Sequence, residues 1–321
     1  GTTMNNVLFA TTTLVAAGSA GAAFADGHET PAISFSGYAE LGVTYTDADG
    51  AINDGIDLVG DYGLDIGFAG TSDSGITFGA NTELENGPTA GSDDIDDFNV
   101  FVSGAFGTLT LGDIDSAYDK ASIGIDTGGL ADEADFYAFD SALDGISDPL
   151  SILRYDYTVA GVTLSASIEQ GNGAGIDNIL SAGLGYAGDF GGIDLGFGLA
   201  YQQTETDPVS GLGDGDHTVI GVGASLGFSS ITVKASYQIF DLQPAAGGDF
   251  DSIQGSIKYS AGAISVGANV VVNTGDREDE SFGAFAAYDL GGGLALEGAI
   301  SSSNITGDDV INAGFGFSMS F

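Results

Sequence analysis

The stretch "ISFSGYAELGVTYT", residues 33–46, decides the fold, because apolar and polar side chains alternate along it. One parity holds Ile33, Phe35, Ala39, Leu41, Val43 and Tyr45, and the other holds Ser34, Ser36, Glu40, Thr44 and Thr46. Successive side chains of an extended strand point to opposite faces. The stretch therefore predicts a strand with one apolar and one polar face.

The same alternation recurs to the end of the chain, which closes on "INAGFGFSMSF", residues 311–321. Counting the segments with this period predicts sixteen strands. They span residues 33–46, 56–68, 76–85, 97–106, 107–113, 151–159, 162–170, 178–188, 192–203, 217–228, 231–241, 251–260, 263–273, 281–290, 294–303 and 309–321.

Short separators such as "FSS" and "SAGA" roughly alternate with longer acidic ones such as "TETDPVSGLGDGD". Strands of about ten residues, with short turns at one end and long loops at the other, are typical of an outer-membrane β-barrel. Lipid offers no hydrogen bonds, so only a closed sheet satisfies every strand edge. The sequence thus predicts an all-β fold, a 16-stranded antiparallel transmembrane barrel.

A soluble β-sandwich or a solenoid would also show alternating strands. A sandwich of this length would consist of several domains, and no linker or change in composition divides the chain. A solenoid requires a fixed repeat, whereas the spacing here is irregular. Both alternatives are less consistent with the sequence than the barrel.

Composition sets further limits on function. The chain has 46 acidic and 5 basic residues, a net charge of −41 and no cysteine. Nucleic-acid binding depends on clusters of Lys and Arg, which this chain cannot supply, so cations are the expected small partners. Disorder would require few aromatic residues, but the chain has 20 Phe and 12 Tyr.

The first segment resembles a secretory signal peptide. Met4 is the expected start, a mildly apolar stretch follows, and Ala23-Phe24-Ala25 matches a cleavage site, which predicts a mature chain from Asp26. The usual basic residues at the start are replaced by Asn5 and Asn6. We therefore expect residues 1–25 to be an export signal with extra upstream residues and residues 26–321 to form the barrel.

Several motifs resemble those of general bacterial porins, most closely the alpha-proteobacterial type typified by Rhodobacter. The strongest is "VFVSGAFGTLTLGD", Val100 to Asp113, which resembles the signature before the long third loop of these proteins. "ISFSGYAELGV", "GTSDSGITFGANTELE", "DPLSILRYDY" and "AAYDLGGGLALEGAI" resemble other porin segments in the same order. Each motif is short, but together they span nearly all of the expected mature chain.

The resemblance implies a trimeric, water-filled barrel in the outer membrane of a Gram-negative bacterium, with a third loop that folds inward as a constriction. It also implies that Phe321, the aromatic residue that ends the last strand, is the signal read by the outer-membrane assembly machinery.

The alternation lapses over residues 114–149, which are the candidate inward loop. Between Asp113 and Asp148 it carries ten acidic residues and one lysine. The expected constriction residues are Asp113, Asp115, Asp119, Lys120, Asp126, Asp132, Glu133, Asp135, Asp140 and Asp144. About half of the acidic groups are expected to face the lumen, and the others to face solvent.

The expected pore wall departs from the family pattern, in which basic residues face the acidic loop. The polar parity of the early strands carries Glu40, Asp57, Asp61, Asp65, Glu83, Glu85 and Asp97 and no basic residue. Among the basic residues, only Arg154, Lys234 and Lys258 lie at strand positions whose side chains are expected to face the lumen. Because the Debye length of about 8 Å is comparable to the half-width of a narrow pore, we expect a cation-selective channel for ions and small hydrophilic solutes.

Calcium is a possible bridge between close carboxylates, and Asp93, Asp94, Asp96 and Asp97 in "SDDIDD" supply the hard oxygen ligands that it prefers. Loosely held counterions would also suit these residues, because no known calcium motif is present. No required cofactor is expected.

An enzyme is not expected. The two histidines are His28, just after the expected cleavage site, and His217, in an apparent external loop, and neither has the partners of a catalytic group. The alternative of another class is a secreted acidic structural protein, such as a surface-layer or fibre subunit joined by calcium. Such a protein would not need sixteen strands of barrel length.

Overall fold

The computed structural model describes residues 32–48, 55–86, 93–128, 143, 152–171, 175–305 and 308–321. For residues 48, 86, 93–97, 305 and 308 the description is limited to the backbone. Among the described residues, no helix is long and apolar enough to cross a membrane.

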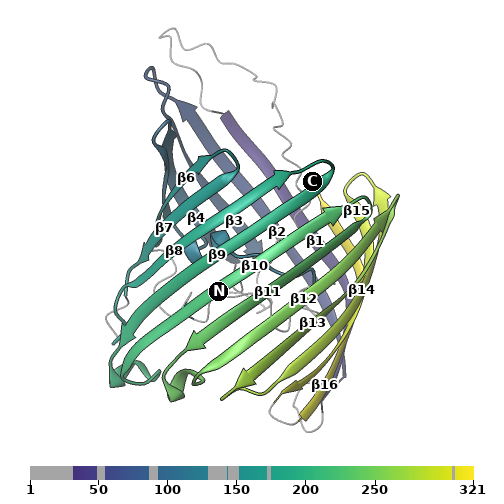
Figure 1. Cartoon of the computed structure of the whole chain (residues 1–321). Coiled ribbons are helices and arrows are strands. Elements are labelled where there is room, and N and C mark those ends of the chain that lie inside the picture. Colours follow the sequence, from purple (N-terminus) through teal and green to yellow (C-terminus); the bar gives the residue numbers. More distant parts are fainter. Residues whose placement is uncertain are drawn as a thin grey trace.

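Sixteen antiparallel strands pair in sequence order, and β16 pairs with β1 to close a barrel (Figure 1). The strands are β1 (Ala32–Ala48), β2 (Gly55–Thr71), β3 (Thr77–Asn86), β4 (Asp93–Gly104), β5 (Gly107–Gly112), β6 (Ile152–Val159), β7 (Val162–Glu169), β8 (Ile179–Asp189), β9 (Ile193–Thr206), β10 (Gly215–Phe228), β11 (Ile231–Asp241), β12 (Phe250–Ala261), β13 (Ile264–Gly275), β14 (Glu280–Gly291), β15 (Leu294–Ile305) and β16 (Asp308–Ser320). The predicted architecture is confirmed, and closure leaves no unpaired strand edge.

The two faces of the sheet differ as the alternation predicts. In β1, Phe35 is 68% exposed and Leu41 is 51% exposed, so the apolar parity forms the outer surface of the barrel. The other parity faces inward, and side chains such as Gln202 and Gln238 are buried there. An apolar outside with a polar inside is the arrangement that lipid and a water-filled lumen require.

The two ends of the barrel also differ. Connections of at most five residues join β2 to β3, β4 to β5 and every second pair thereafter. At the opposite end most connections are longer, and only those from β13 to β14 and from β15 to β16 are equally short. Two of the longer segments contain short 3-10 helices, η2 (Pro208–Ser210) and η3 (Pro244–Ala246). In the turn between β6 and β7, Ala160 and Gly161 both have positive φ, as a tight two-residue hairpin requires.

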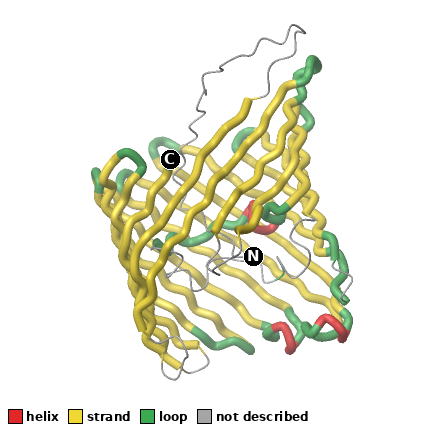
Figure 2. The backbone as a smooth tube through the Cα atoms, turned by 180° about the vertical axis from the view of Figure 1, so that it is seen from behind, coloured by secondary structure: helices red, strands yellow, loops and turns green. Residues whose placement is uncertain are grey.

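The segment after β5 turns into the barrel and forms its single described α-helix, α1 (Ala117–Ala121). The helix begins at Ser116, whose Oγ accepts hydrogen bonds from the backbone N–H groups of Tyr118 and Asp119. This N-cap satisfies donors that the first helical turn leaves without partners. Figure 2 shows α1 and the loop that follows it crossing inside the ring of strands.

The predicted strand ends differ from the observed ones chiefly at β4. This strand begins at Asp93, not at residue 97, so Asp93 to Asp96 pair with β3. The register shifts between Asn81 and Glu83, where residues 97 and 98 oppose Thr82 alone. This β-bulge displaces the alternation by one residue, which is why the acidic half of β4 was missed.

Candidate pore constriction

The described part of the inward loop lies against nine consecutive strands, which we call the docking wall. Each of β6 to β14 contributes an inward-facing residue that contacts residues 115–128. These are Arg154, Ser167, Gly183, Gly198, Gly223, Lys234, Lys258, Asn269 and Phe285. Residues 115–128 of the loop are therefore held against one side of the lumen.

Glycines make room for the loop in the middle of the docking wall. A Cβ atom on Gly183 would lie 2.2 Å from the carbonyl oxygen of Ala117, and one on Gly198 would lie 2.0 Å from that of Ala121. In β10, Gly223 pairs with Gly198 and lies directly under Ile123. Any side chain at these positions would push the loop backbone off the wall.

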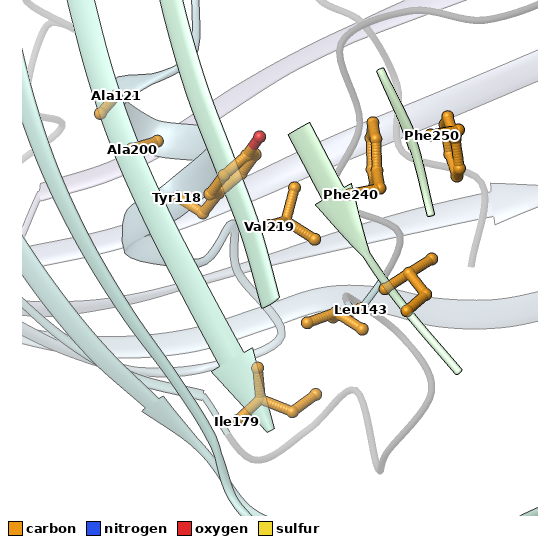
Figure 3. Close-up of a cluster of buried hydrophobic side chains, with 9 residues drawn as sticks. Tyr118, Ala121, Leu143, Ile179, Ala200, Val219, Phe240 and Phe250 are labelled. Atoms are coloured by element: carbon orange, nitrogen blue, oxygen red, sulfur yellow. The ribbon is translucent and has the colours of Figure 1, made fainter. Parts of the chain in front are cut away.

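An apolar cluster fixes α1 and a later part of the loop to the same wall (Figure 3). Tyr118 and Leu143 of the loop pack with inward-facing residues near the long-loop end of the barrel. The wall residues of this cluster are Ile179, Ala200, Val219, Phe240 and Phe250, and Leu242, directly after β11, packs with them. Phe240 and Phe250 stack with ring centroids 4.2 Å apart, which favours a fixed arrangement.

Buried polar groups orient Tyr118 within this cluster. Gln238 donates a hydrogen bond from Nε2 to the Tyr118 hydroxyl at 2.9 Å, and Gln254 donates from Nε2 to Oε1 of Gln238 at 3.2 Å. Tyr118 is fully buried, so its hydroxyl needs such a partner. The chain of amides thus connects α1 to β11 and β12.

Arg154 in β6 holds the start of the loop. Its Nη1 donates to the carbonyl oxygen of Asp115, and its Nε donates to Oδ2 of Asp156 at 2.9 Å. Ser165 donates to the other oxygen of the same carboxylate at 2.6 Å. The guanidinium is nearly buried, and these contacts engage its charge within the wall.

Asp126 holds the far part of the loop. Lys234 of β11 and Lys258 of β12 both donate to its Oδ1, at 2.9 and 3.0 Å. Its backbone N–H donates to Ser256, and its carbonyl oxygen accepts from Asn269. Burial raises the pKa of Asp126, but the charges and hydrogen bonds of Lys234 and Lys258 outweigh burial and lower the pKa below its usual 3.8.

The other side of the lumen, formed by β15, β16 and β1 to β3, carries carboxylates and no Lys or Arg. We call it the acidic wall. Its inward-facing carboxylates are Glu297, Glu40, Asp57, Asp61, Asp65, Glu83 and Glu85. Charges of one sign on a low-dielectric wall focus their field into the lumen.

Strand register brings most of these carboxylates together. Glu40 lies directly opposite Asp61, and Asp65 lies opposite Glu83. On the other side, Glu40 pairs with Ser318, which donates a hydrogen bond to Glu297 at 2.7 Å. The acidic wall is therefore a continuous band across adjacent strands, not a set of scattered charges.

Tyr38 lies within this band. Its hydroxyl is 3.4 Å from Oδ2 of Asp61, and its ring lies over Gly63 beside the carboxylate of Glu83. A Cβ atom on Gly63 would be 2.0 Å from Oε1 of Glu83, so the glycine leaves the space that this carboxylate occupies. This tyrosine was not among the predicted wall residues, although it shares their parity.

The predicted basic residues face the lumen side of the sheet, but they lie on the docking wall. Arg154 pairs with Asp156 of the same wall, whereas Lys234 and Lys258 pair with Asp126 of the loop. Arg277 pairs with Asp279 in the segment after β13. Lys120 on α1 is exposed and has no ion pair with any residue that the structure describes.

The predicted loop acids are placed in different ways. Asp115 is exposed, Asp113 is half-buried, and Asp119 in the first turn of α1 accepts a hydrogen bond from the hydroxyl of the N-cap Ser116 at 3.1 Å. Asp126 binds the two lysines. Asp132, Glu133, Asp135, Asp140 and Asp144 lie outside the described residues.

The predicted calcium ligands belong to the acidic first half of β4. Asp93, Asp94, Asp96 and Asp97 lie in β4, where the description is limited to the backbone, and Asp94 and Asp96 pair with Glu85 and Glu83. Among the described side chains, no group of three His, Asp or Glu residues has a geometry that would hold a metal ion.

The apolar part of the docking wall was missed from the sequence, although a signal was present. Two consecutive apolar residues, as in Ile179-Leu180, Val219-Ile220 and Ile239-Phe240, place one apolar side chain on each face of the strand. In a water-filled barrel an inward apolar residue needs a cover, and the loop provides it.

His217 differs from the expectation of an external loop. It lies in β10, is only 1% exposed, and its Nε2 is 2.8 Å from the hydroxyl of Thr206. The predicted strand had this residue at its first position, next to the loop; because the strand begins two residues earlier, at Gly215, the histidine lies within the sheet on its inward face. Phe321 pairs with Gly37 through two backbone hydrogen bonds, and its ring is exposed.

A closed sixteen-stranded barrel with an apolar outer surface and a loop folded into its lumen defines the class of channel-forming outer-membrane barrels. A family model described as Gram-negative porin matches residues 10–308. A porin of Rhodobacter capsulatus is 26% identical over 306 residues, which cover 87% of this chain and 97% of that protein. The chain therefore belongs to the Gram-negative porin family.

Solved porin structures share the fold. A porin refined at 1.8 Å superposes with a TM-score of 0.70 at 23% identity, covering 90% of this chain and all of that one. An engineered variant of Rh. blastica porin gives a TM-score of 0.70 at 20% identity with the same coverage. These matches confirm the barrel fold, and membership of the family makes the protein a Gram-negative outer-membrane porin, whose relatives are channels and not enzymes.

Proposed function

We propose that this porin is a cation-selective diffusion channel for ions and small hydrophilic solutes. The observation that carries the proposal is the acidic wall, a continuous band of carboxylates on strands that contain no Lys or Arg. The basic residues on the opposite side of the lumen pair with carboxylates of the docking wall or of the inward loop. Permeating ions therefore meet mainly negative charge.

The magnitude of the effect supports selectivity over simple sieving. The Debye length at physiological ionic strength is about 8 Å, so the field of the acidic wall reaches well into a narrow lumen. Low-dielectric walls focus this field and raise the local concentration of cations. Selectivity then depends on the side chains that line the narrowest part of the pore.

The decisive measurement is the reversal potential of the purified porin in a planar bilayer under a KCl gradient. Stepwise conductance with a large potential of the sign for K⁺ permeation is the expected result. Steps with a weak potential, or one of the sign for Cl⁻, would refute the electrostatic part of the proposal while leaving the porin assignment intact.

Three further features belong to the proposal because of the family. We expect a homotrimer, removal of residues 1–25 on export, and recognition of the strand that ends in Phe321 by the outer-membrane assembly machinery. The exposed ring of Phe321 at the barrel edge is available for such recognition. Deleting Phe321 and measuring the yield of folded barrel, by its altered gel migration before heating, tests this role.

The secreted structural alternative is not favoured. A surface-layer or fibre subunit joins its neighbours through exposed edges or loops, whereas this sheet is closed and its outer surface is apolar over the barrel. Extraction discriminates the two, because a porin requires detergent and a calcium-joined subunit is released by a chelator.

A further inference from the structure

Lys234 and Lys258 face inward from adjacent strands at diagonal positions. Lys234 pairs with Ser256, and Lys258 lies two residues further along β12. Diagonal side chains of this kind are within reach of each other when they are long, so the two ammonium groups repel unless an anion lies between them. Oδ1 of Asp126 occupies that position, at 2.9 Å from one and 3.0 Å from the other.

The same residue is also held through its backbone. The N–H of Asp126 donates to Oγ of Ser256 at 2.9 Å, and Asn269 of β13 donates to the carbonyl oxygens of Asp126 and Thr127 at 3.3 and 3.2 Å. Three neighbouring strands thus converge on one residue of the loop. No other charged residue of the described loop has two cationic partners.

We propose that Asp126, Lys234 and Lys258 form a latch that sets the position of the inward loop, and hence the width of the constriction, and that the two lysines contribute little to ion selectivity. The proposal rests on the porin function and makes the lysines positioning residues. Their charge is directed at the loop and not at the acidic wall across the lumen.

The ion pairs can hold the loop in place because the three side chains are partly buried. The Asp126 side chain is 13% exposed, and those of Lys234 and Lys258 are 26% and 29% exposed, so the ion pairs are screened less than surface pairs. Removing the carboxylate leaves two close ammonium groups, and removing the ammonium groups leaves a largely buried carboxylate. Each change costs docking energy, because a buried charge loses its partner.

The latch and a direct electrostatic role predict different results for two variants, Asp126→Asn and Lys234→Gln/Lys258→Gln. If the residues form a latch, both variants release the loop, and both broaden the distribution of single-channel conductances several-fold toward larger values. If the residues act on permeating ions directly, the variants shift the reversal potential in opposite directions and leave the conductance distribution unchanged.

Single-channel recording of both variants in planar bilayers, with folding checked by gel migration before and after heating, separates these outcomes. Opposite potential shifts with unchanged conductance, or no change in either variant, would overturn the proposal. The wild-type reversal potential tests cation selectivity separately, so failure of that proposal is distinguishable from failure of the latch.

A covalent replacement of the latch gives a matched control within one protein, because the chain has no cysteine. Asp126→Cys/Ser256→Cys joins the loop to β12 where the backbone N–H now meets Ser256. The oxidised form is expected to have the narrow conductance distribution of the wild type, and the reduced form the broad distribution of Asp126→Asn. Failure of the folded pair to oxidise, or equal distributions in both forms, would contradict the proposal.

Discussion

The docking wall and the acidic wall are built from the same strand geometry but differ in their inward residues. The docking wall presents glycines, apolar side chains and three basic residues, and the loop covers them. The acidic wall presents carboxylates, and beside them lie short polar side chains that carry a hydroxyl or an amide, such as Ser318 and Asn312. One half of the lumen therefore serves as the site where the loop docks, and the other half as the charged surface of the pore.

The difference shows how a strongly acidic porin can retain an ordered inward loop. A loop rich in Asp would be repelled by an acidic barrel on every side. Placing the lumen cations on one wall gives the loop a single side on which it is attracted, and glycines there allow backbone contact. Charge distribution thus sets both the position of the loop and the polarity of the pore.

The largest effect is expected from filling the space that a wall glycine leaves under the end of α1. Gly198→Val places a side chain where a Cβ atom alone would lie 2.0 Å from the carbonyl oxygen of Ala121. Overpacking of a fitted contact costs about 1 to 3 kcal/mol or more, which is enough to displace the helix. Faster hydrogen exchange in residues 117–121 and a larger single-channel conductance are the expected results.

Gly185→Ala is the matched control for this substitution. Gly185 lies on β8 opposite Gly198, and a Cβ atom there would meet nothing within 4 Å. Its exchange rates and conductance should equal those of the wild type. Equal behaviour of the two variants would show that α1 does not depend on the space at Gly198.

The next effect concerns the acidic wall. Glu40→Gln/Asp61→Asn/Glu297→Gln removes three charges and retains the side-chain shapes. At about 8 Å in water, each unit charge changes the energy of a monovalent ion by about 0.2 kcal/mol after screening. The three charges act with opposite sign on K⁺ and on Cl⁻, a combined difference of about 1.1 kcal/mol, so the ratio of K⁺ to Cl⁻ permeability should fall about sevenfold. The reversal potential in a KCl gradient measures this ratio.

Asp73→Asn provides the reference, because Asp73 is exposed in the short turn between β2 and β3. This substitution should leave the reversal potential within the error of the wild-type value. A triple variant that behaves like Asp73→Asn would mean that the acidic wall does not control selectivity.

The fold could be predicted from the sequence because strand alternation is local. Sixteen segments such as residues 33–46 reveal their own period without knowledge of their partners, and the loop lengths order the hairpins. The error at β4 arose where local reasoning fails, since the bulge opposite Thr82 is a property of two strands. His217 was misplaced for a related reason, because the pairing of Gly215 with Thr206 lengthens β10.

The site was predicted less completely, because a side chain's parity gives its face but not its partner. Glu40, Asp61, Asp65 and Glu83 face inward as parity predicts, yet their grouping depends on register. The pairing of Lys234 with Asp126 joins residues 108 positions apart and has no local signal. The glycines under α1 also look like any other strand glycines until the loop is in place.

A smaller effect is expected from Tyr118→Phe, which removes one hydroxyl from the apolar cluster and leaves the ring. Gln238 loses the acceptor that its Nε2 reaches at 2.9 Å. The loss of one buried hydrogen bond costs about 1 kcal/mol. Hydrogen exchange in α1 should quicken modestly, with little change in conductance, and a conductance as large as that of Gly198→Val would show that the hydroxyl matters more than the packing.

The smallest effect is expected from pH, because the latch resists protonation. The pKa of Asp126 is lowered below 3.8 by Lys234 and Lys258, so the carboxylate strengthens docking above pH 3.8 and loses this contribution only as pH falls through its own lower pKa. The conductance distribution should therefore be constant from neutral pH down to about 3.8 and broaden below it. Asp126→Asn, which carries no proton to gain, should show no such transition. Broadening of the wild-type distribution well above this pH would mean that another group holds the loop.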